Sequence, residues 1–418
     1  MDRFIVKGGS RLKGRISISG SKNSALPILA ATLLTPERCV LHNVPDLSDI
    51  RYMLEILKYL GAEVSFEDNT VAVRASHILS EAPYDLVRKM RASICILGPL
   101  LGRCRRAVIS LPGGCVIGDR PIDIHIKGLE ALGAEFHQEA GNIVAYAPNL
   151  QGCEVDVAGK FGSTVLGTDN VMMAAVLAKG ATTLESAACE PEVRDLAEFL
   201  NKMGAKITGH GTRRVEIEGV GALHGAEHTI IPDRIEAGTF MVAGLITGGD
   251  ITLDKIDGGH MANLIERLEE AGAICKLDDI SLRISAPKKL KPLQITTETY
   301  PGFPTDMQAQ ICALMSVTAG TSVITDKIFP HRFMHLSELK RMGAKVDLEG
   351  STAIITGVDN LTGAPVMASD LRASAALVLA GLTASGDTEV NRVYHIDRGY
   401  EHIDVKLRAL GAKIERLS

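Results

Sequence analysis

Positively charged side chains occupy positions in this sequence where an isolated helix does not favour them. Lys or Arg at a helix N-terminus faces the positive end of the helix dipole, which costs roughly 0.3–1 kcal/mol. For any one of these cations, a side chain extended over a neighbouring loop would be a sufficient explanation. Four cations at equivalent positions favour a common function. Cations and helix N-termini that converge bind polyanions, so we predict a phosphorylated substrate. The four residues begin apolar, helix-patterned stretches: Lys22, Arg91, Arg234 and Arg372.

A single cysteine lies in a loop that suits reactive chemistry. Residues 111–121 (LPGGCVIGDRP) contain three glycines and two prolines, and they place Cys115 five residues before Arg120. A structural cysteine more often belongs to a periodic apolar element, as Cys95 and Cys312 do. A thiol beside a cation has a lowered pKa and serves in nucleophilic or acid-base chemistry. We therefore interpret Cys115 as a candidate catalytic residue, with an inert loop cysteine as the alternative.

Two more polar segments precede helix-patterned stretches. In residues 301–308 (PGFPTDMQ), Asp306 stands at a helix start, where a capping role alone would explain a carboxylate. Residues 394–402 (YHIDRGYEH) crowd ionisable groups ahead of the last amphipathic stretch. Arg398 in this segment shares its position with Arg120 and Arg332, each of which also precedes an amphipathic stretch. These three arginines are therefore further candidates for the anion site.

The elements that position these residues belong to one pattern that the chain repeats six times. In each repeat an amphipathic, helix-patterned stretch ends in Gly-Ala and runs into a short strand, at spacings of 72, 71, 68, 71 and 68 residues. Self-similarity at a fixed period determines the architecture, and glycine is the usual residue that closes a helix in the left-handed conformation. The glycines are Gly61, Gly133, Gly204, Gly272, Gly343 and Gly411.

The second repeat shows the order of its elements. We expect a strand near 85–87, a buried helix over 90–101, a strand over 108–111, an amphipathic helix over 121–132 and a hairpin around 136–144. The order is strand-helix-strand-helix-strand-strand. The other buried helices are expected at 23–34, 169–178, 236–246, 306–318 and 371–382. The other amphipathic helices are expected at 47–60, 192–203, 261–271, 333–342 and 400–410.

The two ends of the chain predict how the repeats are grouped. The sixth repeat stops at residues 414–418, one strand short of its hairpin, and residues 3–7 form a strand pattern that no preceding repeat uses. We infer that the N-terminal strand completes the sixth repeat. Six repeats exceed a single core, so we expect two domains, residues 21–229 with the cysteine loop and residues 1–20 with 230–418. The regular alternation of strands and helices places the fold in the α/β class.

Composition excludes several classes of protein. The chain has 418 residues, 46% hydrophobic content and a net charge of −5, which argues against a nucleic-acid-binding surface. No apolar run reaches the length of a membrane span, and the start of the chain has no signal-peptide pattern. Eight scattered cysteines without a CxxC pair or a His-rich partner support neither a disulfide framework nor a metal site. We expect a cytoplasmic protein.

The polar motifs, together with the six repeats, closely resemble the enolpyruvyl transferase family, and within it the branch that acts on UDP-N-acetylglucosamine. The shikimate-pathway branch lacks the cysteine loop, so Cys115 discriminates between the two. The resemblance spans the whole chain and implies two inside-out α/β barrel domains of three βαβαββ repeats each, joined by a double crossover. It is carried by residues 19–27, 90–93, 111–121, 303–310, 332–335, 370–374 and 394–400.

The resemblance also implies a reaction. The 3′-hydroxyl of UDP-N-acetylglucosamine attacks C2 of phosphoenolpyruvate, a tetrahedral ketal forms, and phosphate leaves, without a cofactor or metal. This is the first committed step of peptidoglycan synthesis. By the family pattern, Cys115 is the acid that protonates C3 and Asp306 is the base that deprotonates the hydroxyl, while Lys22 and Arg398 complete the catalytic set.

The same resemblance assigns residues to the substrates. Arg91, Arg332 and Arg372 are expected to bind phosphoenolpyruvate, and Asn23 is expected to lie near the sugar. One stretch departs from the family pattern, because two extra residues follow Lys160 where the nucleotide phosphates are expected. The remaining implied substrate residues are Arg120, Pro121, Asp123, Ile124 and His125 around the uridine, Lys160, Ser163 and Gly167 at the phosphates, and Glu190, Asp233 and Ile328.

Three alternatives remain open. The shikimate-pathway branch is disfavoured by the cysteine loop. An RNA 3′-phosphate cyclase is built from related repeats, but the negative net charge and the missing nucleotidylation histidine motif argue against it. A non-enzymatic repeat scaffold would have no reason to keep Cys115 and the cationic helix starts.

Overall fold

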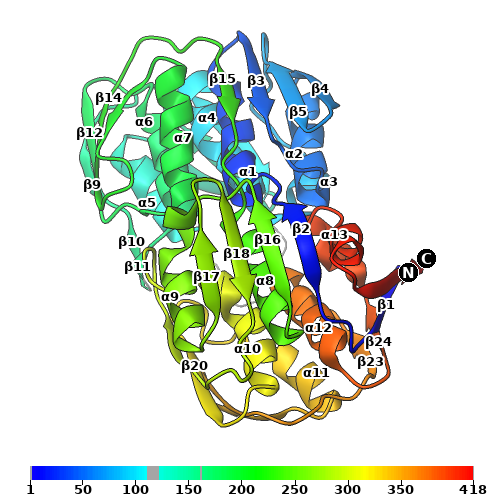
Figure 1. Ribbon diagram of the computed structural model, residues 1–418. Helices are drawn as coiled ribbons and strands as arrows, with labels where there is room; N and C mark the ends of the chain where they lie inside the picture. The colour runs from blue at the N-terminus through cyan, green and yellow to red at the C-terminus, as the bar shows by residue number, and fades with distance from the viewer. Residues whose placement is uncertain (1, 111–121, 161, 418) are drawn as a thin grey trace. The chain divides into compact units, whose positions relative to one another are not determined.

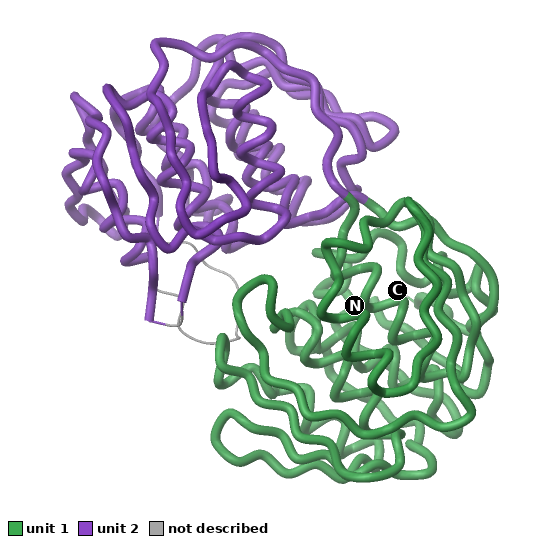
Figure 2. Tube along the Cα trace, turned by 60° about the vertical axis from the view of Figure 1, so that its left-hand side comes forward, with its two compact units in different colours: residues 1–19, 116–118, 232–418 green, residues 20–115, 119–231 purple. Residues whose placement is uncertain are grey.

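The computed structural model of the chain describes residues 2–110, 122–160 and 162–417. These residues form two compact units, which Figure 2 shows in different colours. Unit 1 contains residues 2–19 and 232–417, and unit 2 contains residues 20–110, 122–160 and 162–231. Residues 2 and 417 both belong to unit 1, and within the described residues the chain passes between the units at residues 19–20 and 231–232.

The described residues of unit 2 form two mixed four-stranded sheets, one antiparallel three-stranded sheet and a small two-stranded hairpin. In the four-stranded ones, a central strand pairs in parallel with one neighbour and antiparallel with the inner strand of a hairpin. The strand orders are β15 (Glu227–Thr229)-β3 (Arg38–His42)-β5 (Thr70–Arg74)-β4 (Glu63–Glu67), then β6 (Arg106–Ser110)-β8 (Asn142–Tyr146)-β7 (Glu135–Glu139), and β13 (Lys206–Thr208)-β14 (Arg214–Glu218)-β12 (Ala181–Glu185)-β9 (Glu154–Asp156).

Unit 1 repeats this arrangement in three four-stranded sheets. The strand orders are β17 (Ile274–Leu277)-β18 (Ser281–Ser285)-β16 (Asp250–Asp254)-β2 (Lys13–Ser17), then β19 (Gln294–Thr297)-β20 (Thr321–Asp326)-β22 (Thr352–Thr356)-β21 (Lys345–Glu349), and β23 (Pro365–Met367)-β24 (Asp387–Asn391)-β1 (Arg3–Lys7)-β25 (Lys413–Leu417).

The N-terminal strand completes the sixth repeat, as the sequence predicted. β1 lies between β24 and β25 and pairs antiparallel with both, so that Phe4 faces Val390 on one side and Arg416 on the other. Near each point where the chain passes between the units, one strand pairs with a strand of a different repeat. β2 precedes the first repeat's helices but pairs with β16, while β15 precedes those of the fourth repeat but pairs with β3.

Each repeat contributes a buried helix and an amphipathic helix, as predicted, and Figure 1 shows these helices packed beside their sheets. The buried helices are α1 (Lys22–Ala31), α4 (Leu97–Cys104), α6 (Val165–Ala175), α8 (Arg234–Ile246), α10 (Gln308–Ser316) and α12 (Leu371–Thr383); short 3-10 helices η1 (Thr32–Leu34), η2 (Arg91–Ile96) and η4 (Thr305–Met307) extend three of them. The amphipathic helices are α2 (Ser48–Tyr59), α5 (Asp123–Ala131), α7 (Pro191–Lys202), α9 (Ala262–Glu270), α11 (His335–Arg341) and α13 (Ile403–Ala409).

All six Gly-Ala pairs close their helices in the same way. The six glycines have φ between 90° and 101°, the left-handed region that favours glycine. At each pair the glycine N–H donates to the carbonyl three residues back and the alanine N–H to the carbonyl five residues back, as in Gly61 to Lys58 and Ala62 to Leu57, both 3.0 Å. This is the Schellman closure of a helix C-terminus, and it explains why the pair recurs.

One predicted strand is wrong. Residues 85–87 belong to a short helix, α3 (Tyr84–Val87), and Glu81 instead forms an isolated parallel bridge with Val108. The carbonyl of Pro83 accepts from the N–H groups of Leu86 and Val87, both at 3.1 Å. Proline before a first helical turn with an aspartate in it is a helix-start pattern, which outweighs the apolar alternation of so short a segment.

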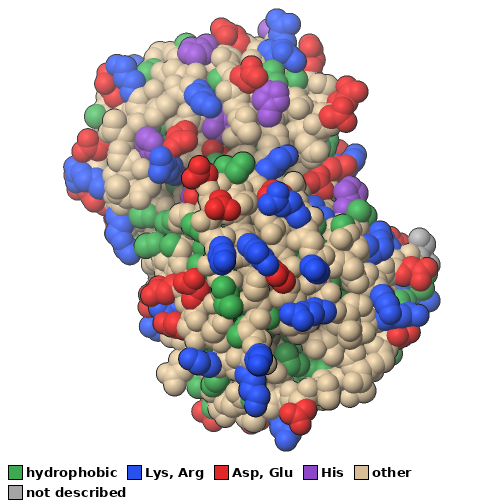
Figure 3. Space-filling view, viewed as in Figure 1, with side chains coloured by type: hydrophobic (Ala, Val, Ile, Leu, Met, Phe, Trp, Pro, Cys, Tyr) green, Lys and Arg blue, Asp and Glu red, His purple; other side chains and the backbone are tan. Residues whose placement is uncertain are grey.

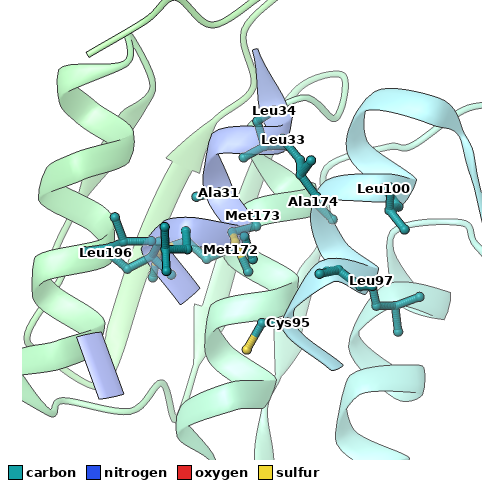
Figure 4. Close-up of a cluster of buried hydrophobic side chains, with 14 of the residues drawn as sticks. Ala31, Leu33, Leu34, Cys95, Leu97, Leu100, Met172, Met173, Ala174 and Leu196 are labelled. Carbon is teal, nitrogen blue, oxygen red and sulfur yellow. The ribbon is translucent and has the colours of Figure 1, made fainter. Parts of the chain in front are cut away.

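Each unit has its own apolar core. In unit 2, Leu97 of α4, Met172 of α6 and Leu196 of α7 belong to one buried apolar cluster, part of which Figure 4 shows in close-up. On the face seen in Figure 3, acidic and basic side chains are interspersed and hydrophobic ones occur in small groups. Among the described residues, no helix combines the length and apolar composition that a membrane crossing requires.

Candidate active site

Three of the predicted site residues lie outside the described residues: Cys115, Arg120 and Pro121. The other predicted residues are divided between the two units, and those of each unit are described separately.

The centre of the unit 1 group is an aspartate between two buried arginines. Arg332 Nη1 lies 2.7 Å from Asp306 Oδ1, while Arg372 Nε and Nη2 lie 3.2 and 3.0 Å from Asp306 Oδ2. The side chains of Arg332 and Arg372 are only 7% and 2% exposed. Asp306 therefore does not act as a helix cap, since its carboxylate binds two guanidinium groups instead. The structure brings together three residues that are 26 to 66 positions apart.

Local structure holds each of these side chains in place. Asp306 lies within η4, directly before α10. Arg372 lies in the first turn of α12, where Asp370 caps the helix and accepts from the N–H groups of Arg372 and Ala373 at 2.9 and 3.1 Å. The guanidinium of Arg372 stacks over the ring of Tyr400 at 5.2 Å, which fixes its direction.

The electrostatics of this group follow from burial and charge. Burial alone would raise the pKa of Asp306, but Arg372 and Arg332 outweigh it and hold that pKa well below its usual range. Burial would lower the pKa of Arg372, yet Tyr400, Asp306 and Asp233 keep it above its usual value. The group is therefore ionised at neutral pH, as one carboxylate and two guanidinium groups, with a net positive charge.

Two further buried polar residues support the group, and sequence reasoning missed both. Asp326 at the end of β20 accepts from Thr305 Oγ1 at 2.7 Å and from the N–H groups of Ile328 and Phe329 at 3.0 and 2.8 Å. Gln310 donates from Nε2 to the carbonyl of Asp306 at 2.9 Å. A buried side chain that satisfies the backbone next to a charged group is typical of a site that must keep its shape.

The remaining unit 1 residues lie on other elements, and of these Asp233 acts on the charge of Arg372. Asp233 is buried and caps α8, accepting from the N–H groups of Ile235 and Glu236 at 2.8 and 2.9 Å. Arg398 ends a 3-10 helix, η5 (Val393–Arg398). Burial, and then the charge of Arg398, lower the pKa of His395. Ile328 follows β20 in the turn that Asp326 organises.

In unit 2, the cation at the start of the first helix has an acidic partner. Lys22 is the first residue of α1, and its ammonium lies 3.3 Å from Asp49 Oδ2 in the first turn of α2. Their side chains are 11% and 4% exposed. This buried pair offsets the unfavourable place of a cation at a helix N-terminus. The next residue, Asn23, is half-buried.

A histidine of the predicted uridine stretch is fixed by a buried asparagine. Asn170 Nδ2 donates to His125 Nδ1 at 2.9 Å and to the Ile94 carbonyl at 2.9 Å, and its Oδ1 accepts from the Gly98 N–H at 2.7 Å. Burial, and then the charge of Arg91, lower the pKa of His125 to about 3. His125 is therefore neutral at physiological pH with its proton on Nε2. Sequence reasoning missed Asn170, because it lies within an apolar helix pattern.

Other predicted phosphate and uridine residues meet near the start of α6. Ser163 pairs with Ala158 in a small hairpin of β10 (Ala158–Gly159) and β11 (Gly162–Ser163), and Lys160 is in its turn. Thr164 caps α6 by accepting from the Gly167 N–H at 3.0 Å. A Cβ at residue 167 would lie 2.2 Å from Thr164 Oγ1 and 3.1 Å from Ile124, so only glycine allows this approach. Asp123 begins α5 and is exposed.

A group of acidic residues lies where α6 and α7 begin. Glu190 precedes α7, whose first residue is Pro191. Asp169 on α6 is 1% exposed, and neither of its carboxylate oxygens has a hydrogen-bond partner among the described residues. Burial, and then Glu190 and Glu192, raise the pKa of Asp169 well above its usual range. Over the described ranges, no three His, Cys, Asp or Glu residues are grouped to hold a metal ion, and the seven described cysteines are free thiols.

Comparison with known proteins identifies the family. The family described as "EPSP synthase (3-phosphoshikimate 1-carboxyvinyltransferase)" matches residues 6–407. The chain belongs to this family of enolpyruvyl transferases. It is 61% identical to a UDP-N-acetylglucosamine 1-carboxyvinyltransferase of Methylacidiphilum infernorum, over 100% of this chain and 99% of that protein. It is 57% identical, with the same coverage, to one of Akkermansia muciniphila.

Solved structures agree with this membership. The enolpyruvyl transferase NikO from Streptomyces tendae superposes with a TM-score of 0.91 at 26% identity, over 100% of this chain and 99% of that one. EPSP synthase from Acinetobacter baumannii superposes with a TM-score of 0.78 at 17% identity over all of both chains, which shows a shared fold. The predicted α/β class is thereby confirmed.

Proposed function

We propose that this chain transfers the enolpyruvyl group of phosphoenolpyruvate to the 3′-hydroxyl of UDP-N-acetylglucosamine and releases phosphate, the first committed step of peptidoglycan synthesis. The observation that carries the proposal is the 61% identity, along the full chain, to a protein named for this reaction. The arrangement of Asp306, Arg332 and Arg372 is consistent with it, since phosphoenolpyruvate carries a phosphate and a carboxylate that cations must neutralise.

Arg332 and Arg372 have a defined role in this proposal. Both are buried and already oriented, so they can bind an anion without the cost of ordering their side chains. A substrate anion would compete with Asp306 for the same guanidinium groups. Lys22, Arg91, Arg120 and Arg398 supply the other positive charges by the family pattern, which stabilise charge as it moves from the ketal to the departing phosphate.

Asp306 is the proposed base, and its partners determine how strong a base it is. Paired with two arginines it is ionised, but its low pKa makes it a poor proton acceptor. An anion that draws Arg372 and Arg332 away would weaken the pairing and raise the pKa of Asp306. Substrate binding would thus activate the base that removes the proton from the 3′-hydroxyl.

Cys115 is the proposed acid that delivers a proton to C3 of phosphoenolpyruvate. The proposal rests on the sequence of its loop and on the family pattern. Cys115→Ser is expected to lose most activity, while Cys115→Asp, which still donates a proton, keeps some. An epoxide phosphonate of the fosfomycin type is expected to alkylate this thiol. Equal activity of the Ser variant and the native enzyme, or an adduct mapped elsewhere by mass spectrometry, would remove Cys115 from the mechanism.

The nucleotide sugar is assigned mainly to unit 2 residues, and Asp233 and Ile328 of unit 1 complete the set. Asn23 is proposed to contact the sugar, and Asp123, Ile124 and His125, with Arg120 and Pro121, the uridine. Lys160, Ser163 and Gly167 are proposed for the nucleotide phosphates, with Glu190, Asp233 and Ile328 as further substrate contacts. The short approach between Gly167 and Ile124 supports placing the uridine and phosphate contacts side by side. A cytoplasmic location would suit these substrates and the free thiols.

The choice of acceptor is the decisive experiment. Phosphate release from phosphoenolpyruvate is measured with UDP-N-acetylglucosamine in one series and with 3-phosphoshikimate, the acceptor in the family description, in another. We expect release only in the first series. Release only with 3-phosphoshikimate would assign the chain to the other branch of the family.

A further inference from the structure

A buried carboxylate on α7 joins three segments of unit 2. Asp195 Oδ2 accepts from the hydroxyl of Ser24 and from the N–H of Ile231 at 3.3 Å, and its Oδ1 lies 2.8 Å from His228 Nε2. Asp195 is 2% exposed, Ser24 is fully buried and His228 is 4% exposed. A carboxylate this deep is stable only when donors satisfy its oxygens, so Asp195 depends on these three partners.

The direction of each hydrogen bond in this group is determined. Lys202 Nζ lies 3.0 Å from His228 Nδ1, and an ammonium can only donate, so Nδ1 accepts. The proton of a neutral imidazole is then on Nε2, which donates to Asp195. The contacts from Lys202 through His228 and Asp195 to Ser24 thus form one continuous hydrogen-bonded chain.

This group holds the turn that carries two proposed site residues. Ser24 is the third residue of α1, next to Asn23 and two residues after Lys22. Ile231 is fixed on both sides, because its N–H donates to Asp195 and its carbonyl accepts from the Ser21 N–H at 2.7 Å. The first turn of α1 and the segment after β15 are therefore bound to α7 through one carboxylate.

We propose that Asp195 is a positioning residue for the transferase reaction: through Ser24 and Ile231 it sets the place of Lys22 and Asn23. The proposal rests on the proposed function. A displacement of about 1 Å in a group that binds substrate can cost up to about 100-fold in rate. Asp195 touches neither Lys22 nor Asn23 in the described contacts, so it acts through the turn that bears them.

Unit 1 contains a corresponding arrangement, which supports the interpretation. Glu236 on α8 is 2% exposed, and its Oε2 accepts from the Ser19 N–H at 2.7 Å while Oε1 accepts from Lys406 at 2.5 Å. The Ser19 carbonyl accepts from the N–H of Asp233, a proposed site residue, at 2.9 Å. In each unit, a segment next to the point where the chain passes between the units is thus hydrogen-bonded to a buried carboxylate. A proposed substrate residue adjoins that segment in each case.

The test compares two hydroxyl deletions in the same stretch of helix. Ser24→Ala removes the contact to Asp195. Thr32→Val is the matched control, because Thr32 is also buried and its Oγ1 donates only to the nearby Leu29 carbonyl at 2.6 Å. Each variant is measured by phosphate release with both substrates, by thermal unfolding, and by hydrogen–deuterium exchange of residues 21–26.

We expect Ser24→Ala to lower kcat about tenfold and to speed amide exchange in residues 21–26. Thr32→Val is expected to lower Tm as much as Ser24→Ala does, but to keep both kcat and the amide exchange of residues 21–26 at their native values. His228→Gln, whose amide can still donate to Asp195, is expected to retain most activity, and His228→Leu to lose it. These paired variants keep the test valid if one of them folds poorly.

Two results would overturn the proposal. One is native exchange in residues 21–26 of Ser24→Ala; the other is faster exchange with unchanged kcat in an active enzyme, which would make the contact merely structural. If the native enzyme releases no phosphate with UDP-N-acetylglucosamine, the proposed function fails. Exchange then decides separately whether Asp195 holds the turn.

Discussion

Arg372 donates two hydrogen bonds, from Nε and Nη2, to a single carboxylate oxygen of Asp306, at 3.2 and 3.0 Å. The other oxygen of Asp306 is left for Arg332. A guanidinium can make this two-pronged contact because its donors are coplanar and fixed, and the stacking of Arg372 over Tyr400 keeps the plane in place. The geometry of the pair thus depends on arginine and not on positive charge alone.

Arg372→Lys is therefore expected to behave as a severe change. An ammonium cannot replace both hydrogen bonds or the stacking, so we expect kcat/KM for phosphoenolpyruvate to fall about 100-fold, equivalent to about 2.7 kcal/mol. Arg283→Lys is the matched control: Arg283 makes a similar contact to Asp250 through Nε and Nη2, at 2.9 and 2.6 Å, but its side chain is 55% exposed. Steady-state kinetics with native values for both variants would contradict a role for the buried pair.

Asp306→Asn is expected to reduce both activity and stability. Two buried guanidinium groups would lose their carboxylate, and breaking a buried ion pair from one side costs about 3 kcal/mol. Because the folded pKa of Asp306 is depressed, the stabilisation is fully present above the unfolded pKa of about 3.9 and is lost only as the pH falls toward the folded value. The Tm difference between native enzyme and variant should stay constant from pH 5 to 8. A difference that disappears within this range would refute the low pKa.

The pH dependence of the kinetics tests whether substrate activates Asp306. In the free enzyme the low pKa of Asp306 predicts no acid limb from this group in kcat/KM above about pH 4. If phosphoenolpyruvate draws the arginines away, the pKa in the complex is higher and the acid limb of kcat moves to higher pH. Superimposable acid limbs in the two profiles would show that Asp306 is not activated in this way.

Asp169→Asn is expected to stabilise the protein. Burial, with Glu190 and Glu192, raises the folded pKa of Asp169, so the folded chain keeps a proton that the unfolded chain releases above about pH 4. The free energy of unfolding of the native protein therefore falls, through Asp169, as the pH rises from about 4 toward the folded pKa of this residue. The Tm gain of the variant should grow between pH 4.5 and 7.5.

The matched comparison for this prediction is Asp195→Asn. That carboxylate is equally buried but accepts three hydrogen bonds, so the same substitution should lower Tm. A Tm gain of Asp169→Asn that does not change with pH would mean that the proton on Asp169 is not the cause.

Much of the fold could be predicted because local chemistry repeats. Gly61 and its five counterparts mark helix ends that depend only on the neighbouring turn, and the unclaimed strand at Phe4 identified the sixth repeat. The failure at Tyr84–Val87 came from a segment too short for periodicity to separate a strand from a helix. The exchange of β2 and β15 between sheets also has no local signal, since only long-range pairing determines it.

The site was predictable only in part, and for a similar reason. Arg372 was found because a cation at a helix N-terminus conflicts with local preference, and Arg332 because it precedes an amphipathic stretch, as Arg120 and Arg398 do. Asp326 and Asn170 were missed because a polar residue inside an apolar pattern does not indicate which distant donors it will meet. Asp306 was found, but its partners lie 26 and 66 residues away, so its ion pairs could not be distinguished from a helix cap.

The central claim is tested most directly by the identity of the product. Phosphoenolpyruvate labelled with ¹³C is incubated with UDP-N-acetylglucosamine and the enzyme, and the product is examined by NMR and mass spectrometry. We predict an enolpyruvyl ether on the 3′-oxygen of the sugar, formed with one equivalent of phosphate. Unchanged UDP-N-acetylglucosamine, under conditions where the enzyme is folded, would contradict the account.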